Sequence, residues 1–230
     1  MTPPVVKICG ITNVSDAMAA IQAGADWLGF IFVPDTPRFI TVETAQAILQ
    51  AVRSQSPPTQ CVGVFQNASA ETIQAHWAAL GLDQIQLHGD ETPAFCEQLP
   101  APVIKTLLLQ PHLSFSNLST TAMAYLQANN VKTLLLDLPK NSAVKAVGSL
   151  PDAVGLRSFL STFPSLLAGG VTADNLQSVL EQFQPVGVDV ASGVEQAPGQ
   201  KDVEKMNRFC QIIQNFKSQP NHGDPLSCNP

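Results

Sequence analysis

Eight short apolar runs, separated by segments with helical periodicity, constrain the fold of this chain more than any other feature of its sequence. Each run has four or five residues and is almost continuously apolar, which is typical of strands buried on both faces of a parallel sheet. The intervening segments place apolar side chains three or four positions apart, as at Ala45, Ile48, Leu49 and Val52. The predicted strands are residues 5–9, 27–31, 61–65, 84–87, 103–106, 133–137, 165–168 and 187–190.

Regular alternation of strand and helix implies a wholly parallel sheet, and eight such strands close naturally into a (β/α)8 TIM barrel. A doubly wound open sheet is the alternative, but it usually has fewer strands and a glycine-rich first turn, whereas Gly10 stands alone after the first predicted strand. The length of 230 residues suits one barrel, which commonly takes about 200 to 250 residues. We expect residues 1–217 to form a catalytic barrel and residues 218–230, rich in Pro, Asn and Gly, to form a disordered tail.

Composition limits the possible partners. The formal net charge of −6 argues against a nucleic-acid or an anionic membrane surface. Five cysteines without a C-x-x-C pair form neither a disulfide framework nor a zinc site, and they suit a reducing cytosol. No signal peptide is visible, and no apolar run approaches the ~18 residues of a membrane span. We therefore expect a cytoplasmic protein that acts on a small molecule, with a monomer and a homodimer both left open.

Two residues at strand ends are candidates for acid–base chemistry. Cys9 ends the first predicted strand and Asp137 ends the sixth, so a barrel would place both on the rim where active sites lie. A thiolate can accept a proton and a protonated carboxyl can donate one, and the two groups could reach opposite sides of a small substrate. The alternative interpretations are a buried structural cysteine and a helix-capping aspartate.

Two glycine-bearing loops predict a phosphate site. Gly169-Gly170 follow the seventh predicted strand and Ser192-Gly193 follow the eighth, where backbone amides can approach an anion closely. Either loop alone could be a tight turn. Because barrels frequently bind phosphate with the loops after strands seven and eight, the two together favour a phosphorylated substrate.

Two further residues of the predicted rim could contact a ligand. Arg38 lies in a loop poor in charge, where its guanidinium could bind a carboxylate through two parallel hydrogen bonds, unless it is an ordinary surface arginine. His88 follows the fourth predicted strand and is either a hydrogen-bonding lining residue or a structural histidine.

Seven motifs follow one another along the chain in an order that points to a known family. They are Lys7-Ile8-Cys9-Gly10-Ile11-Thr12, Pro37-Arg38, Gln86-Leu87-His88-Gly89-Asp90-Glu91, Leu135-Leu136-Asp137, Leu167-Ala168-Gly169-Gly170, Gly187-Val188-Asp189-Val190-Ala191-Ser192-Gly193-Val194-Glu195 and Pro198-Gly199-Gln200-Lys201-Asp202. Together they closely resemble the phosphoribosylanthranilate isomerases, over about residues 5–215.

The resemblance implies a cofactor-independent and metal-independent aldose–ketose isomerase, an intramolecular oxidoreductase of tryptophan biosynthesis. Its reaction would be the Amadori rearrangement of N-(5-phosphoribosyl)anthranilate to 1-(2-carboxyphenylamino)-1-deoxyribulose 5-phosphate. The resemblance makes Asp137 the general acid at the furanose ring oxygen, Cys9 the general base at C2, and Arg38 the ligand of the anthranilate carboxylate. The residues that it assigns to the phosphate end are Gly169, Gly170, Asp189, Ser192 and Gly193.

One stretch departs from the family pattern. These enzymes usually carry Gly-Gly-Thr-Gly after the acidic residue, whereas residues 145–148 here read Lys-Ala-Val-Gly, with Asp152 further on and Ala191 where serine is common. Fewer glycines should stiffen or re-route a lid over the substrate. The alternative function is therefore a sugar-phosphate-binding barrel with weakened or altered activity. A third hypothesis, indole-glycerol-phosphate synthase, has only Lys105 in its support.

Overall fold

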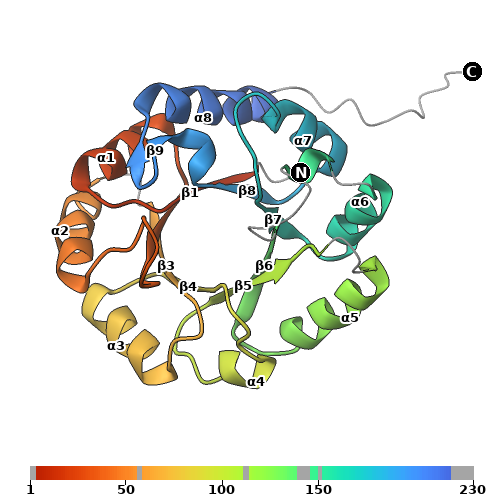
Figure 1. Ribbon diagram of the computed structural model, residues 1–230, viewed down its shortest axis with the longest axis horizontal. Coiled ribbons are helices and arrows are strands. Elements are labelled where there is room, and N and C mark those ends of the chain that lie inside the picture. The colour runs from red at the N-terminus through yellow and green to blue at the C-terminus, as the bar shows by residue number, and fades with distance from the viewer. Residues whose placement is uncertain (1–3, 56–58, 111–113, 139–145, 150–151, 219–230) are drawn as a thin grey trace, which may run out of the picture.

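The structure is a computed structural model that describes residues 4–55, 59–110, 114–138, 146–149 and 152–218. Eight parallel strands hydrogen bond in sequence order, and the first pairs with the last, so the sheet is a closed barrel (Figure 1). These strands are β1 (Val5–Cys9), β2 (Trp27–Ile31), β3 (Gln60–Phe65), β4 (Gln84–Leu87), β5 (Val103–Leu108), β6 (Val131–Asp137), β7 (Ser165–Leu167) and β8 (Gly187–Val190). The predicted (β/α)8 barrel is confirmed.

A ring of helices covers the outside of the barrel (Figure 1). They are α1 (Val14–Ala23), α2 (Val42–Val52), α3 (Ala70–Leu80), α4 (Pro93–Cys96), α5 (Phe115–Leu126), α6 (Ala153–Thr162), α7 (Leu176–Phe183) and α8 (Val203–Ser218). Several begin where a side-chain oxygen accepts a hydrogen bond from the first turn, as Asn13 does for α1 and Asp152 for α6. The capping role of Asp152 gives this residue of the altered sixth loop a local structural function.

Apolar side chains form two separate clusters. The larger lies between the outer faces of the strands and the helices, and includes Leu28, Phe65, Leu134 and Phe209. The smaller consists of strand residues and the residue that follows β7; its buried members are Val62, Ile104, Leu135, Leu166 and Ala168. Because side chains alternate between the two faces of a strand, the smaller cluster is the filling of the barrel interior. Polar side chains lie above this cluster, on the rim where the strands end.

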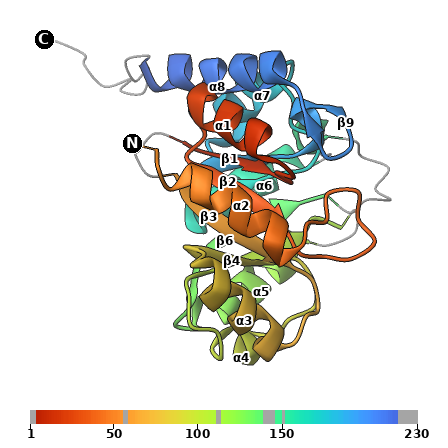
Figure 2. The ribbon, with the colours of Figure 1, turned by 90° about the vertical axis from the view of Figure 1, so that its left-hand side faces the viewer.

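A two-stranded antiparallel hairpin interrupts the regular pattern between β8 and α8. It follows the short 3-10 helix η2 (Ser192–Val194) and consists of β9 (Glu195–Ala197) and β10 (Gln200–Lys201). The periodicity of the sequence did not predict this hairpin, because strands of two and three residues are too short to show any. In the side view the hairpin and the loop between β2 and α2 extend at the same end of the barrel (Figure 2).

Several element boundaries differ slightly from the sequence-based prediction. The strand β5 extends to Leu108 and β6 begins at Val131, because the ladder between them continues from Val103 to Leu108. Apart from Ser218, which ends α8, the predicted tail lies outside the described residues, as do residues 139–145 of the sixth loop.

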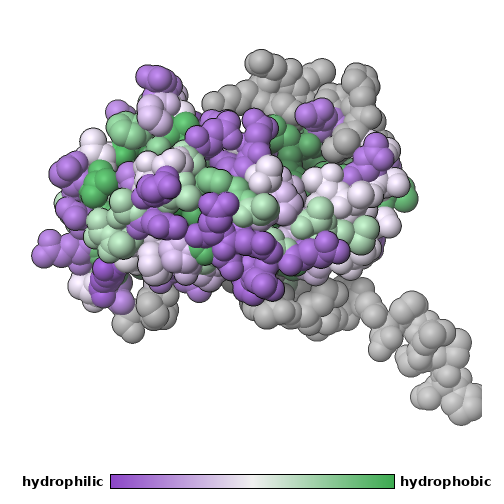
Figure 3. Space-filling view, turned by 90° about the horizontal axis from the view of Figure 1, so that it is seen from below, coloured by the Kyte–Doolittle hydropathy of each residue, from purple (hydrophilic) through white to green (hydrophobic). Residues whose placement is uncertain are grey.

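On the face over α3 to α5, hydrophilic and smaller hydrophobic areas alternate (Figure 3). In the described part of the chain, no helix has both the length and the apolar character needed to cross a membrane.

Candidate active site

The predicted site residues gather where the parallel strands end. Cys9 and Asp137 are the last residues of β1 and β6, and His88 follows β4 directly. Gly169 and Gly170 come after β7, Ser192 and Gly193 belong to η2 after β8, and Arg38 lies between β2 and α2. Because all eight strands are parallel and the barrel is closed, the loops that carry these residues form one rim.

A buried lysine lies beside the Cys9 thiol. Lys7 and Cys9 are two positions apart in β1, so both side chains face the barrel interior. The Lys7 side chain is fully buried, and its Nζ lies 2.8 Å from Asp189 Oδ1 in the neighbouring strand β8. The Lys7 ammonium also interacts electrostatically with the Cys9 thiol. Gly29 faces Cys9 in β2, and a Cβ atom there would lie 2.7 Å from Cys9 Sγ. The absence of a side chain at Gly29 therefore leaves the room that the thiol occupies.

Burial and the charges around Cys9 shift the pKa of its thiol in different directions. Burial raises the pKa of the thiol above its ordinary value, and the Asp189 carboxylate raises it further. The ammonium groups of Lys7 and Lys201 lower it, without offsetting burial completely. Near neutral pH the thiol is therefore the main form, and the thiolate is a minor form that the two lysines stabilise.

Asp137 combines partial burial with a histidine neighbour. Its Oδ1 accepts a hydrogen bond of 2.7 Å from the Leu138 amide, and its Oδ2 lies 3.7 Å from His88 Nε2. Burial raises the pKa of this carboxyl from 3.8 to about 6, although the Leu138 amide opposes the shift. Roughly a tenth of the carboxyl is then protonated at pH 7, which is enough for it to serve as a proton donor.

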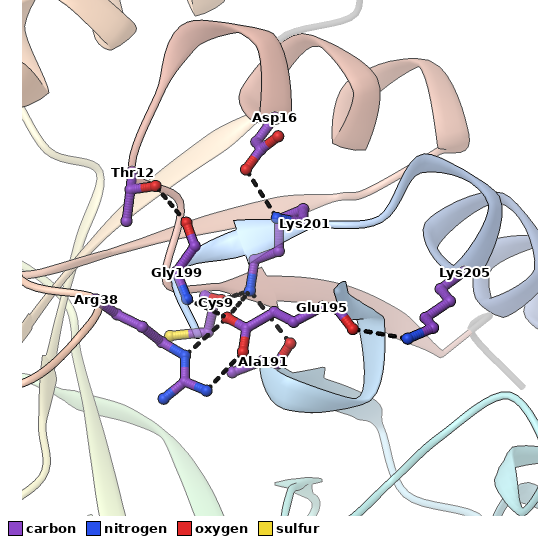
Figure 4. A network of polar contacts seen from close by, with 9 residues as sticks. All are labelled: Cys9, Thr12, Asp16, Arg38, Ala191, Glu195, Gly199, Lys201 and Lys205. Carbon is purple, nitrogen blue, oxygen red and sulfur yellow. Dashed lines mark hydrogen bonds and ion pairs between the residues drawn. The ribbon is translucent and has the colours of Figure 1, made fainter. Parts of the chain in front are cut away.

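The guanidinium of Arg38 is held by a carboxylate of the β9–β10 hairpin (Figure 4). Arg38 Nε and Nη2 donate to Glu195 Oε1 and Oε2 at 2.8 and 2.6 Å, and Lys201 Nζ donates to Oε1 at 2.9 Å. Burial acts to raise the pKa of Glu195, but the hydrogen bonds from Arg38 and Lys201 outweigh it and hold that pKa below its ordinary value. The pair is therefore ionised, and the guanidinium keeps a fixed orientation.

The two glycine-bearing loops pack against each other. Gly169 and Gly170 adopt left-handed backbone angles, with φ of +92° and +67°. A Cβ atom at Gly193 would lie 2.1 Å from the carbonyl oxygen of Val171, so only glycine fits this close approach. The Asn175 side chain braces the first loop by donating to the Gly170 carbonyl and accepting from the Thr172 amide. Phosphate binding by these loops stays a prediction.

In the structure, Asp189 and Lys105 contact other groups than the sequence analysis suggested. Asp189, which the family resemblance assigns to the phosphate end, has its carboxylate on Lys7 within the barrel, and phosphate binding by it stays a prediction. Lys105 makes a buried ion pair with Glu91 at 2.7 Å and also donates to the Gly89 carbonyl, which supports the loop after His88. Among the described residues, no group of three or more His, Cys, Asp or Glu side chains is arranged to hold a metal ion.

Sequence reasoning did not identify Lys7, Glu195 or Lys201 as site residues. Alternation along β1 could have indicated Lys7, because it shares the inward face of Cys9. Glu195 and Lys201 lie in recognised motifs, but their proximity to Cys9 and Arg38 depends on a hairpin that no periodicity revealed. The contacts that surround the thiol therefore emerge only from the folded chain.

Comparisons with known proteins identify relatives along nearly the whole chain. Residues 6–212 match the family model of N-(5'-phosphoribosyl)anthranilate (PRA) isomerase. The chain is similar to an N-(5'-phosphoribosyl)anthranilate isomerase of Gloeothece citriformis, with 40% identity over 93% of this chain and 95% of the relative.

Two solved structures extend the comparison. Monomers obtained from the dimeric phosphoribosylanthranilate isomerase of Thermotoga maritima share 31% identity, with a TM-score of 0.76 over 92% of this chain and 99% of the other. A phosphoribosyl anthranilate isomerase in complex with reduced 1-(o-carboxyphenylamino)-1-deoxyribulose 5-phosphate shares 30% identity, with a TM-score of 0.75 over the same shares of the two chains.

Proposed function

The chain belongs to the N-(5'-phosphoribosyl)anthranilate isomerase family, and on this premise we propose that it catalyses the Amadori rearrangement of N-(5-phosphoribosyl)anthranilate in tryptophan biosynthesis. The observation that carries the proposal is the pair of Cys9 and Asp137, at the ends of two non-adjacent strands of one rim. A thiol and a carboxyl in these places can exchange protons with different atoms of one bound sugar.

The first step of the proposed reaction uses Asp137 as general acid. Its proton goes to the furanose ring oxygen, the bond between C1 and that oxygen breaks, and the lone pair of the anthranilate nitrogen forms the C=N bond of a Schiff base. The carboxyl suits this role because burial keeps its pKa at about 6, so a protonated fraction persists near neutral pH. His88 Nε2 lies 3.7 Å from Oδ2, so the imidazole faces the carboxylate that remains.

The second step uses the Cys9 thiolate as general base. It removes the proton from C2, the electron pair of that bond forms the C1=C2 bond of an enolamine, and tautomerisation then gives the ketone. C1 is reduced while C2 is oxidised within one molecule, so the reaction balances without an external oxidant or reductant. We therefore propose a cofactor-independent intramolecular oxidoreductase.

The remaining rim residues are proposed to bind the two ends of the substrate. Arg38 would bind the anthranilate carboxylate, and the amides of the Gly169-Gly170 and Ser192-Gly193 loops would bind the phosphate. All of these residues belong to one chain, which supports a site that is complete in a monomer as well as in a homodimer. A reducing compartment suits the free thiols of Cys9, Cys61, Cys96 and Cys210, so the cytoplasm is the proposed location.

Turnover of freshly generated phosphoribosylanthranilate, followed by the loss of its fluorescence, tests the proposal. Cys9→Ala and Asp137→Asn should each lower kcat by at least about 100-fold, the lower range for loss of a general acid or base. Cys61→Ala is the matched control, because Cys61 is an equally buried cysteine that packs in the outer core. A folded wild type without turnover, or an active Cys9→Ala variant, would contradict the assignment.

A further inference from the structure

Lys201 joins three segments of the rim through one ammonium group. Its side chain is fully buried, and its Nζ donates to the Cys9 carbonyl at 2.6 Å, the Ala191 carbonyl at 3.2 Å and Glu195 Oε1 at 2.9 Å (Figure 4). An ammonium has three N–H donors, so these contacts use all of them. The acceptors belong to β1, to the residue after β8 and to β9; Cys9 is 192 positions from Lys201 in the sequence, whereas the other two acceptors are within ten.

Glu195 connects Lys201 to Arg38 through hydrogen bonds. The same Oε1 that accepts from Lys201 also accepts from Arg38 Nε, while Oε2 accepts from Nη2. The Nε edge of the guanidinium is thereby occupied, and Figure 4 shows its other terminal nitrogen pointing away from Glu195. The Arg38 side chain packs directly against Gly10, where a Cβ atom would lie 2.5 Å from Arg38 Cδ. A bound carboxylate can therefore approach Arg38 only from its Nη1 side.

We propose that Lys201, acting with Glu195, is a positioning residue that sets the Cys9 backbone and the Arg38 guanidinium in a fixed relation to each other. This inference rests on the proposed function, in which Cys9 is the base and Arg38 holds the substrate carboxylate. Removal of the C2 proton requires the thiolate to lie at a defined position relative to the bound anthranilate. A link from the backbone of the base to the arginine that binds the substrate fixes that relative position.

The charge balance around Cys9 gives Lys201 a second effect. Lys7 and Asp189 form a neutral ion pair, whereas Lys201 and Arg38 share the single carboxylate of Glu195. One positive charge is therefore left over near the thiol, and a thiolate at Cys9 neutralises it. Burial lowers the pKa of the Lys201 ammonium, and Glu195 opposes that shift, so Glu195 also keeps the ammonium charged.

The hairpin that carries Lys201 is anchored independently of its side-chain amine. Thr12 Oγ1 donates to the Gly199 carbonyl at 2.6 Å, and the Lys201 amide donates to Asp16 Oδ2 at 2.9 Å. Lys205 Nζ donates to the backbone carbonyl of Glu195 at 2.7 Å. Replacement of the Lys201 amine should therefore leave the hairpin in place and remove only the link among the rim segments.

Lys201→Met and Glu195→Gln test the proposal against Lys205→Met as matched control. Lys205 is also a lysine that contacts the hairpin, but it reaches only the backbone of Glu195. We expect Lys201→Met to lower kcat by about 100-fold, because a displaced base loses its alignment with C2. We expect Glu195→Gln to raise KM by about tenfold with a smaller change in kcat, because Arg38 loses the charge that orients it. Lys205→Met should have wild-type constants.

The pH profile of kcat/KM separates positioning from a merely structural role. Cys9 is faced by Lys7, Asp189, Lys201 and Arg38, and loss of the Lys201 charge should move the alkaline limb to higher pH. Wild-type kinetics and pH profile in a folded Lys201→Met variant would overturn the inference. If that variant does not fold, Glu195→Gln decides, since an unchanged or lower KM would refute the inference.

Failure of the proposed function would give a different result from failure of the inference about Lys201. The wild type itself would then show no turnover, and the reduced product analogue becomes the probe for all variants. Weaker binding of that analogue by Glu195→Gln than by Lys205→Met would still support the link from Lys201 to Arg38. Equal binding by the two variants would reject it.

Discussion

Replacement of Lys7 by methionine should destabilise the barrel strongly, because it leaves the Asp189 carboxylate without its cation. The Lys7 side chain is fully buried and that of Asp189 is 11% exposed, so water can compensate for the lost partner only slightly. Removal of one partner of a buried ion pair costs about 3–5 kcal/mol, and the slight exposure of Asp189 places this case near 3 kcal/mol. For a domain of this size that corresponds to a fall in Tm of about 6–12 °C.

Urea unfolding of the wild type, Lys7→Met, Asp189→Asn and the double variant forms the appropriate cycle. The double variant should recover part of the loss, because it removes the uncompensated charge together with its partner. Arg208→Met is the matched control, because Arg208 pairs with Asp174 on the surface, and its midpoint should not change. A loss below about 1 kcal/mol in Lys7→Met, or a double variant no more stable than it, would refute the reasoning.

Two further predictions concern the thiol and the acid. Gly29→Ala should lower turnover markedly, because the new Cβ would lie 2.7 Å from Cys9 Sγ; Gly63→Ala, which crowds a leucine side chain in the outer core, should lower stability but keep turnover. Equal turnover in the two variants would contradict this. The profile of kcat/KM should have an acidic limb near pH 6, where Asp137 titrates, and an alkaline limb above the ordinary range of a cysteine. The active form needs protonated Asp137 with ionised Cys9, so it is a small and constant fraction between these limits; a single limb, or an acidic limb below pH 5, would reject the assignment.

Much of the fold could be predicted because its determinants are local. Each strand is a short apolar run, and the ends of β1, β2, β4 and β8 agree with the prediction residue by residue. The extension of β5 to Leu108 depended instead on its neighbour, since the ladder with β6 provides hydrogen-bond partners up to Asp137. The hairpin of β9 and β10 was missed because it is held by tertiary contacts, such as the bond from Thr12 to Gly199.

The sequence by itself determined the barrel, its rim and the identity of the chemical groups on that rim, because strand order and strand ends follow from apolar runs along the chain. Only the tertiary structure decided the electrostatic surroundings of those groups. Lys7 meets Asp189 across 182 positions, and Lys201 meets Cys9 across 192. Closure of the barrel brings the last strand and the hairpin against the first strand, and burial there makes each charge depend on its partner. The state of the Cys9 thiol and the orientation of Arg38 are therefore properties of the closed barrel.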